Sequence, residues 1–550
     1  MALLHLGMQG ALMFFGGLGA LLVLAVIVTV IAVVSRSSNR RTQTDGEGGD
    51  LVSYLILALA MGVAGFALAE LASTAFPGES LVFDPASELA TSLSFLVVSA
   101  PLAFYFWRRQ AARRARFPGS AGWTIYLAII EVVFVTALVV AAVDFVNGLF
   151  TEEPANNWTR VVVFGAVVVF HELSARATPP RSDAGELSRV IGSAIGLVTS
   201  MTGLIGLLGA GVLMELYGAM VSSANTPEYH PWLAMVIIGA PLWWYRWLRP
   251  WRQEPGLPFW TYTSMLSVLS LTISVGSATA VMISVLQYLV SDVPPAGEHF
   301  ELLPFEGAFL LVGFGVWVLH RARLGRERTH QVRAYEYLMA AIGLGVAVAW
   351  AVILTAIAFG TSQIVGGDPG DVVLAATILV VGLVVWLWFT TRSNKGEHEI
   401  EATAWPRRVY HLGLGVVLGL VAAGGLITTL FILINRLLGE QAGSLLEPGA
   451  VFVYAGLATW YLLASYLTER EAMASDEVVT PFDVTIISSH PGTIATRFPK
   501  QAKVRVLHRG DVSGAIDDEM ADEIVAAVNN KSSLVWVDDD GFRIAPARTS

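Results

Sequence analysis

The chain has 550 residues, of which 55% are hydrophobic and 14% are charged, with a formal net charge of -10 and no cysteine. An ordinary globular domain carries about 25% charged residues, so this composition excludes a string of soluble domains and indicates a membrane protein. The lack of cysteine excludes disulfides, Cys-ligated zinc, iron–sulfur clusters and thiol nucleophiles.

Hydrophobic runs long enough to cross a bilayer recur almost to residue 470. They predict thirteen transmembrane helices, at 8–34, 51–76, 87–107, 123–147, 158–174, 187–218, 232–248, 259–290, 303–320, 334–359, 372–390, 409–435 and 450–467. The first run is too long for the core of a signal peptide, and the basic stretch "SRSSNRR" follows it directly. Residues 1–50 are therefore predicted to form a retained anchor and a basic loop.

The charges of the loops predict the orientation of these helices. The loop after each odd-numbered span is rich in arginine, as in "RRQAARRAR", whereas the loop after each even-numbered span is acidic, as in "TEEPANN". The positive-inside rule makes the arginine-rich loops cytoplasmic. We therefore expect an all-α polytopic bundle in the plasma membrane, with the N-terminus outside, the C-terminus inside, and arginine clusters on anionic lipid headgroups.

After the first span, the chain reads as six helical hairpins, at 51–116, 123–181, 187–252, 259–328, 333–395 and 407–470. At intervals of 65 to 75 residues, the outgoing helices begin with Tyr54, Tyr126, Ile191, Tyr262, Tyr335 and Tyr410. Four returning helices carry Gly-x-x-x-Trp, at Gly239/Trp243, Gly313/Trp317, Gly382/Trp386 and Gly456/Trp460. Glycine permits close helix packing and tryptophan anchors at the headgroups, so a structural role is favoured over a ligand site.

The third returning helix ends in "PLWWYRWLRPWRQ", residues 241–253. Alone, this aromatic and basic stretch is compatible with nucleic-acid or cation binding. At the cytoplasmic end of a span, it instead predicts an aromatic belt of Trp244, Tyr245 and Trp247, with Arg246 near the headgroups or stacked on Trp243. No nucleic-acid partner is expected.

Paired helices that begin with an Arg-x-Tyr sequence, such as "RAYEY" or "RRVYH", and return through a tryptophan resemble a prokaryotic membrane family of unknown function built from tandem two-span units. The resemblance is strongest over 333–470 and weaker over 51–328. It implies a bacterial envelope protein and no particular activity.

Ionisable residues inside a span are candidates for function, because an unpaired charge costs several kcal/mol in a bilayer. Glu131 lies about eight residues inside the fourth span, or about 12 Å along the helix. It is the best candidate for a proton or cation site. The alternative is a structural glutamic acid, which is favoured because no second buried charge has an evident pairing with it.

Three further acids, Glu70, Asp144 and Glu215, come near the outer ends of successive outgoing helices. They could form an outer ring that attracts cations. Solvation at the interface is the favoured interpretation, since the later hairpins lack the acid.

Small polar residues follow one face of the helix predicted at 259–290. They are Ser267, Ser270, Ser274 and Ser277. Such a stripe lines a polar path or lets helices pack closely, and packing is favoured.

His171 and Glu172 match the start of a zinc-protease motif, but position 175 is alanine where the second histidine would stand. We therefore predict no metalloprotease, no metal site and no cofactor.

Residues 475–550 have a soluble composition. "DVTIISS" and "KVRVLH" predict strands, "AIDDEMADEIVAAVNN" predicts a helix, and "SLVWVDDDGFRIAP" predicts a hairpin. A small cytoplasmic α+β domain is expected, with "DDDG" as a tight turn rather than a calcium loop. A protein partner fits this domain better than a nucleic acid.

Two functions follow. The first is a non-enzymatic membrane scaffold or sensor that carries a cytoplasmic interaction domain. The alternative is a transporter or channel for a small solute or cation that uses Glu131. A membrane-embedded enzyme is disfavoured, since no catalytic motif is recognised.

Overall fold

A computed structural model describes most of the chain. The described residues are 47–75, 85–116, 120–151, 158–176, 183–213, 215, 229–248, 256–291, 295–325, 329–362, 368–393, 404–440, 443–475, 482–488, 494–498, 502–508, 516, 518–528, 533–538 and 541–546. They divide into two compact units, Met1–Leu462 and Leu463–Ser550. The anchor span expected at 8–34 lies outside the described residues.

The regular elements of the first unit are all helices among the described residues. A backbone in lipid must satisfy its own hydrogen bonds, and a helix does so within one segment. Its first half contains α2 (Glu47–Ala75), α3 (Pro85–Arg116), α4 (Ala121–Ile130), the π-helical turn η1 (Glu131–Val135), α5 (Thr136–Thr151), α6 (Trp158–Arg176), α7 (Asp183–Gly206), η2 (Leu207–Leu213), α9 (His230–Trp243) and η3 (Trp244–Leu248). Its second half contains α10 (Leu257–Val290), α11 (Ala296–His299), α12 (Leu303–Leu324), α13 (His330–Ala358), α14 (Pro369–Ser393), α16 (Trp405–Arg408), η4 (Val409–Leu414), α17 (Gly415–Leu437) and the start of α18 (Leu446–Ser475).

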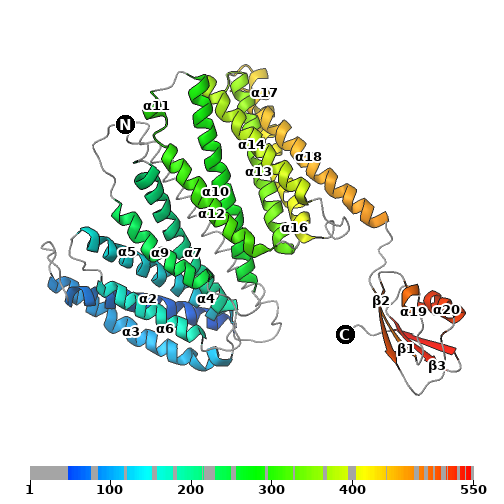
Figure 1. The fold of residues 1–550 in the computed structure, drawn as a ribbon, viewed down its shortest axis with the longest axis horizontal. Coiled ribbons are helices and arrows are strands. Elements are labelled where there is room, and N and C mark those ends of the chain that lie inside the picture. The colour runs from blue at the N-terminus through cyan, green and yellow to red at the C-terminus, as the bar shows by residue number, and fades with distance from the viewer. Residues whose placement is uncertain are drawn as a thin grey trace. The chain divides into compact units, whose positions relative to one another are not determined.

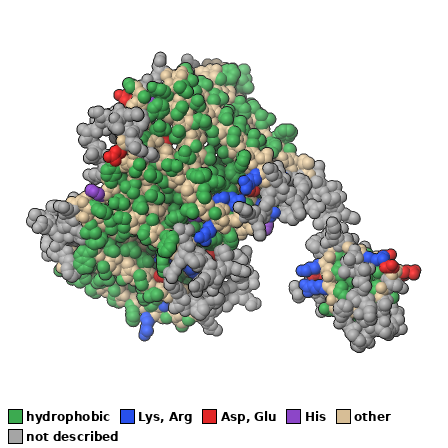
Figure 2. Space-filling view, in the orientation of Figure 1, with side chains coloured by type: hydrophobic (Ala, Val, Ile, Leu, Met, Phe, Trp, Pro, Cys, Tyr) green, Lys and Arg blue, Asp and Glu red, His purple; other side chains and the backbone are tan. Residues whose placement is uncertain are grey.

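Eleven helices among the described residues are long and apolar enough to cross a membrane. They coincide with eleven of the expected spans. The span expected at 232–248 is helical, as α9 and η3, but is not among these eleven. Hydrophobic side chains cover much of the surface of this unit (Figure 2), as expected of a multi-pass membrane protein. The total of thirteen spans and their orientation remain predictions.

Consecutive helices pair in the first unit (Figure 1). α2 packs on α3, α7 on α9, α10 on α12 and α13 on α14. Neighbouring pairs then meet in chain order, through α4 and α7, through α7 and α10, and through α10 and α14. The helices therefore lie as hairpins side by side, and their descent from one repeated unit remains a prediction.

Three of the four motif glycines lie where helices cross closely. A Cβ added at Gly239 would lie 2.5 Å from the backbone nitrogen of Ser200, and one at Gly382 would lie 2.9 Å from that of Ala347. At Gly313 the nearest atom is Ser274 Oγ, at 2.8 Å. The prediction that the motif glycine permits close packing is wrong for Gly456, where a Cβ would meet nothing within 4 Å. The close approach in the last hairpin is made by Gly425 of the outgoing helix instead, because its Cβ would lie 2.8 Å from a backbone atom of α18.

The serine face of α10 lies largely inside the bundle. Ser267, Ser270 and Ser274 are buried, and Ser277 is half-buried. The hydroxyls of Ser267 and Ser274 donate to the carbonyl four residues earlier, at 2.8 and 2.9 Å. Satisfied hydroxyls inside the bundle are the arrangement that close packing needs.

The second unit contains a mixed sheet formed by β1 (Phe482–Ser488), β2 (Ala502–His508), β3 (Ser533–Asp538) and β4 (Gly541–Pro546), with α19 (Ile494–Arg497) and α20 (Asp518–Val528). The strand order is β2-β1-β3-β4; β1 pairs in parallel with β2 and β3, and β3 pairs antiparallel with β4. The antiparallel pairing of Asp538 with Gly541 makes β3 and β4 a hairpin that closes at the two ends of "DDDG", whose middle residues lie outside the described residues. Val484, Ile486, Val535 and Val537 form a core with the buried side of α20.

Candidate functional site

A buried arginine joins two glutamates inside the first unit. Arg246 Nη2 lies 3.0 Å from Glu131 Oε1, and Arg246 Nη1 lies 2.6 Å from Glu172 Oε2. The side chains of Arg246 and Glu131 are each 4% exposed. We call these three side chains the buried ion network. It links η1 and α6, from the second expected hairpin, to η3 of the third.

Helix α7 also contacts the buried ion network, through Ser188 and Gly192. Ser188 Oγ donates to Glu131 Oε2 at 3.0 Å. A Cβ added at Gly192 would lie 2.6 Å from Glu131 Oε1, so only glycine leaves room for the carboxylate there. Glu131 is therefore held by groups from α7 and η3 rather than by solvent.

Both ends of the Glu131–Arg246 pair lie on π-helical turns. Glu131 opens η1, and Arg246 lies in the middle of η3. A π-turn adds one residue to a helical turn and rotates the side chains that follow, and such turns are frequent at functional sites. Neither turn could be read from hydrophobic spacing.

Two expectations about this region were wrong. Glu131 has a charged partner, and Arg246 is buried against carboxylates instead of reaching lipid headgroups or stacking on Trp243. Arg246 lies 74 positions after Glu172 and more than a hundred after Glu131, so only the packing of two hairpins reveals these partners. The network has two carboxyl groups and one guanidinium, and it is electrically neutral when one carboxyl group holds a proton.

The other candidate acids are solvated or paired at the surface. Glu70 of α2 forms a salt bridge with Arg160 of α6 at 3.0 Å, with both side chains partly exposed. Asp144 of α5 and Glu215, which follows η2, are exposed. These positions fit solvation at an interface better than a ring around a pore.

The tyrosines that begin the outgoing helices are all buried, as is Ile191 in the remaining position. Two of them bind the motif tryptophan of the preceding hairpin. Trp317 Nε1 donates to the hydroxyl of Tyr335, and Trp386 Nε1 donates to that of Tyr410, each at 3.0 Å. These tryptophans therefore connect successive hairpins. Trp460, in the last hairpin, is 70% exposed and has the position of a lipid-facing anchor.

Trp243 and Trp247 belong to an aromatic cluster rather than a ligand cage. Trp247 is 1% exposed and stacks on Phe259 and His320, with ring centroids 4.7 and 5.2 Å apart. Trp243 stacks on the same histidine at 6.1 Å. Placing Trp247 in the aromatic belt was therefore wrong, because α10 and α12 cover it. Trp244 and Tyr245 are exposed, as the belt requires.

His171 is likewise a buried structural histidine. Its Nε2 lies 2.6 Å from the hydroxyl of Tyr126, and its Nδ1 lies 2.8 Å from the carbonyl of Val167. Among the described residues, no group of three or more His, Asp or Glu side chains is placed to hold a metal ion.

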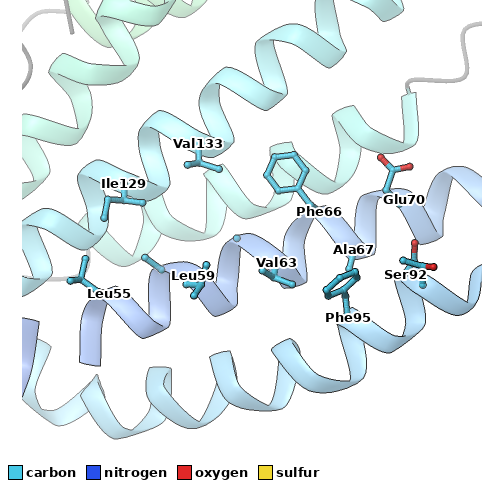
Figure 3. Close-up of a pocket in the computed structure, with 13 residues that line it drawn as sticks. Leu55, Leu59, Val63, Phe66, Ala67, Glu70, Ser92, Phe95, Ile129 and Val133 are labelled. Carbon is cyan, nitrogen blue, oxygen red and sulfur yellow. The ribbon is translucent and has the colours of Figure 1, made fainter. Parts of the chain in front are cut away.

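A groove runs between α2, α3 and the α4–η1 helix (Figure 3). Its volume is about 700 Å³, and it is lined by Leu55, Ala58, Leu59, Gly62, Val63, Phe66, Ala67, Glu70, Thr91, Ser92, Phe95, Ile129 and Val133. Glu70 and Ser92 lie at one end, and Leu55 and Ile129 lie toward the other. Sequence reasoning missed this groove, because its walls are ordinary lipid-compatible residues.

Two segments of the chain match one family. Residues 50–170 and 333–462 match the model of a domain of unknown function (DUF5671). The first match covers the first expected hairpin and most of the second, with the groove and Glu131, and the second match covers most of the last two expected hairpins. No curated protein and no solved structure matches the chain. The match and the eleven apolar helices fit a multi-pass integral membrane protein, and they assign no activity.

Proposed function

We propose that the protein is a non-enzymatic membrane scaffold or sensor, whose helical bundle carries the C-terminal unit as a cytoplasmic interaction domain. The proposal is supported by one observation above all: among the described residues, helices pack on one face of the C-terminal sheet alone, and we call the opposite face the uncovered face. An apolar sheet face is normally covered by helices or by a second sheet. A sheet face that no helix or sheet covers contacts either water or a partner.

The uncovered face has an apolar centre with basic residues around it. The strand register places Ile487 between Leu507 and Trp536, and Trp536 opposite Arg543. Leu507 is 52% exposed and Trp536 is 39% exposed. Exposed basic residues of the same face, Lys503 and Arg505, follow along β2. Tryptophan and arginine are the residues that most often dominate the energy of a protein interface.

Charge separates across the C-terminal unit. The exposed residues of α20, on the covered side of the sheet, include Asp522 and Glu523. On the uncovered face, the exposed basic residues Lys503, Arg505 and Arg543 outnumber the exposed acid Asp483. Arg497 binds Asp522 at 2.7 Å on the acidic side. Complementary charge steers association, so the partner that fits the uncovered face is a protein with an acidic segment.

Photo-crosslinking in cells tests this proposal on the full chain. A photoreactive phenylalanine replaces Leu507 on the uncovered face or, as a matched control, Glu523 on α20. We expect a single discrete protein adduct from position 507 that position 523 does not give, and we expect Arg505→Glu to reduce its yield. Identical adducts from both positions, or none from 507, would contradict an interaction domain with this surface.

A transporter or channel that uses Glu131 is the second candidate. The π-helical turns at Glu131 and Arg246 favour it, because transport sites often lie where helices are irregular. The tight pairing of Glu131 favours the structural role instead. Flux of protons and small cations in proteoliposomes separates the two functions: a transporter requires flux that Glu131→Gln abolishes, whereas a scaffold shows none in either protein.

A further inference from the structure

The groove between α2, α3 and α4–η1 has polar residues at one end alone. Glu70, Thr91 and Ser92 come from the end of α2 and the beginning of α3, which meet because the two helices form an antiparallel hairpin. The rest of the lining is apolar. A groove with one polar end matches an amphiphile.

We propose that this groove binds one phospholipid with an amine-bearing headgroup, its acyl chain along the apolar part and its headgroup at Glu70 and Arg160. This proposal does not depend on the scaffold or sensor function. The volume of the groove, about 700 Å³, lies within the range of small-molecule binding sites.

The length of the groove suits an acyl chain. Leu55 and Glu70 stand fifteen positions apart on α2, which is about 22 Å at 1.5 Å per residue. Half of a hydrocarbon core is about 15 Å, so a chain that enters at Glu70 can extend through its leaflet within the groove. Leu59 and Phe95 are exposed at 70% and 56%, so the groove has lipid-facing walls through which a chain can enter.

Small residues of α2 make the space. Ala58 and Ala67 are buried in the lining, and Gly62 lies between them. A Cβ added at Gly62 would meet nothing within 4 Å. Gly62 is therefore not required by helix packing, unlike Gly65 of the same helix, whose Cβ would lie 2.5 Å from the ring of Phe134. The open position at Gly62 is the feature that a bound chain would use.

Glu70, at the polar end of the groove, pairs with Arg160 of α6, which lies outside the groove lining. Glu70 and Arg160 lie 3.0 Å apart, and their side chains are 49% and 38% exposed. A guanidinium binds phosphate through two parallel hydrogen bonds, and a carboxylate accepts hydrogen bonds from an ammonium. A primary ammonium offers three such donors, whereas a quaternary ammonium offers none. The pair therefore selects an ethanolamine headgroup over a choline headgroup and over anionic headgroups without an amine.

Native mass spectrometry of the full-length protein, released from nanodiscs that contain equal amounts of ethanolamine, choline and glycerol phospholipids, tests the proposal. The wild type is expected to retain one ethanolamine phospholipid. Gly62→Leu should weaken binding at least tenfold, because its side chain displaces two or more methylenes from the groove and each displaced methylene weakens binding about fourfold. Gly345→Leu is the matched control, since a Cβ at Gly345 of α13 also meets nothing within 4 Å.

Headgroup selection is tested separately by Glu70→Gln, which should remove the preference for ethanolamine over choline while leaving a lipid bound. Equal occupancy in Gly62→Leu and wild type, or no headgroup preference in the wild type, would identify ordinary annular lipid and overturn the proposal. If Gly62→Leu does not fold, a photoreactive acyl chain on the ethanolamine lipid is crosslinked to the wild type. Adducts on peptides containing Phe66 or Phe95 support the groove, and adducts spread over all spans refute it.

Discussion

Removal of the guanidinium from the buried ion network should destabilise the bundle far more than removal of a surface arginine. Arg246→Gln leaves the carboxyl groups of Glu131 and Glu172 without the cation that lies 3.0 and 2.6 Å from them. Loss of one partner from a buried ion pair costs about 3–5 kcal/mol, because the remaining charge stays desolvated. Arg160→Gln breaks a pair whose side chains are 38% and 49% exposed, and such pairs contribute at most about 1 kcal/mol.

Unfolding of the purified protein in mixed micelles with increasing denaturing detergent, followed by tryptophan fluorescence, measures both variants. We expect Arg246→Gln to lower the free energy of unfolding by about 3–5 kcal/mol. Glu131→Gln should cost less, because Arg246 retains Glu172, and the double variant should cost less than the sum of the two single variants. The structural role of the network is refuted if Arg246→Gln is no more destabilising than Arg160→Gln.

Three further predictions concern the packing and the orientation of the hairpins. Gly382→Ala should destabilise the bundle by about 1–3 kcal/mol, because its Cβ would lie 2.9 Å from a facing backbone nitrogen. Gly456→Ala should leave the stability unchanged or raise it by up to about 1 kcal/mol, because its Cβ meets no atom and alanine favours the helix. Equal effects of the two variants in the same unfolding assay would contradict this. Trp386→Phe and Tyr410→Phe should each cost about 1 kcal/mol, and combining them should cost little more, as a double-mutant cycle would show. A reporter fused after Ser222 should be active outside the cytoplasm, and cytoplasmic activity would overturn the predicted orientation.

The helical part of the fold could be predicted because its signal is local. An apolar run of about 20 residues predicts a bilayer helix whatever lies elsewhere in the chain, and eleven expected spans coincide with the eleven apolar helices. The π-helical turns could not be predicted in this way, since one added residue in a turn leaves the hydrophobic pattern almost unchanged. The parallel pairing of β1 with β2 and β3 likewise depends on contacts between segments far apart in the chain.

Only one partner of the candidate ion pair could be predicted from the sequence, because the other depends on contacts between segments far apart in the chain. Glu131 could be identified alone, because a charge within an apolar run is unusual. Arg246 could not be identified as its partner, since an arginine at the end of a span looks like a residue of a cytoplasmic loop. Its burial depends on the position of α7, where Gly192 leaves room for the pair. A glycine that faces a buried charge on another helix has no signature in the sequence.

The part of the chain between residues 170 and 333 makes polar contacts with both segments that match the unknown-function domain. Arg246 binds Glu131 of the first matched segment, and Trp317 binds Tyr335 of the second. A fragment 47–181 would leave Glu131 in an apolar bundle without its cation, whereas 47–252 restores Arg246. We therefore expect the longer fragment to accumulate in membranes at a higher level, and we expect Arg246→Gln in it to remove the difference. Equal levels of the two fragments would show that the matched segment is stable alone and that the buried ion network is not what joins it to the following hairpin.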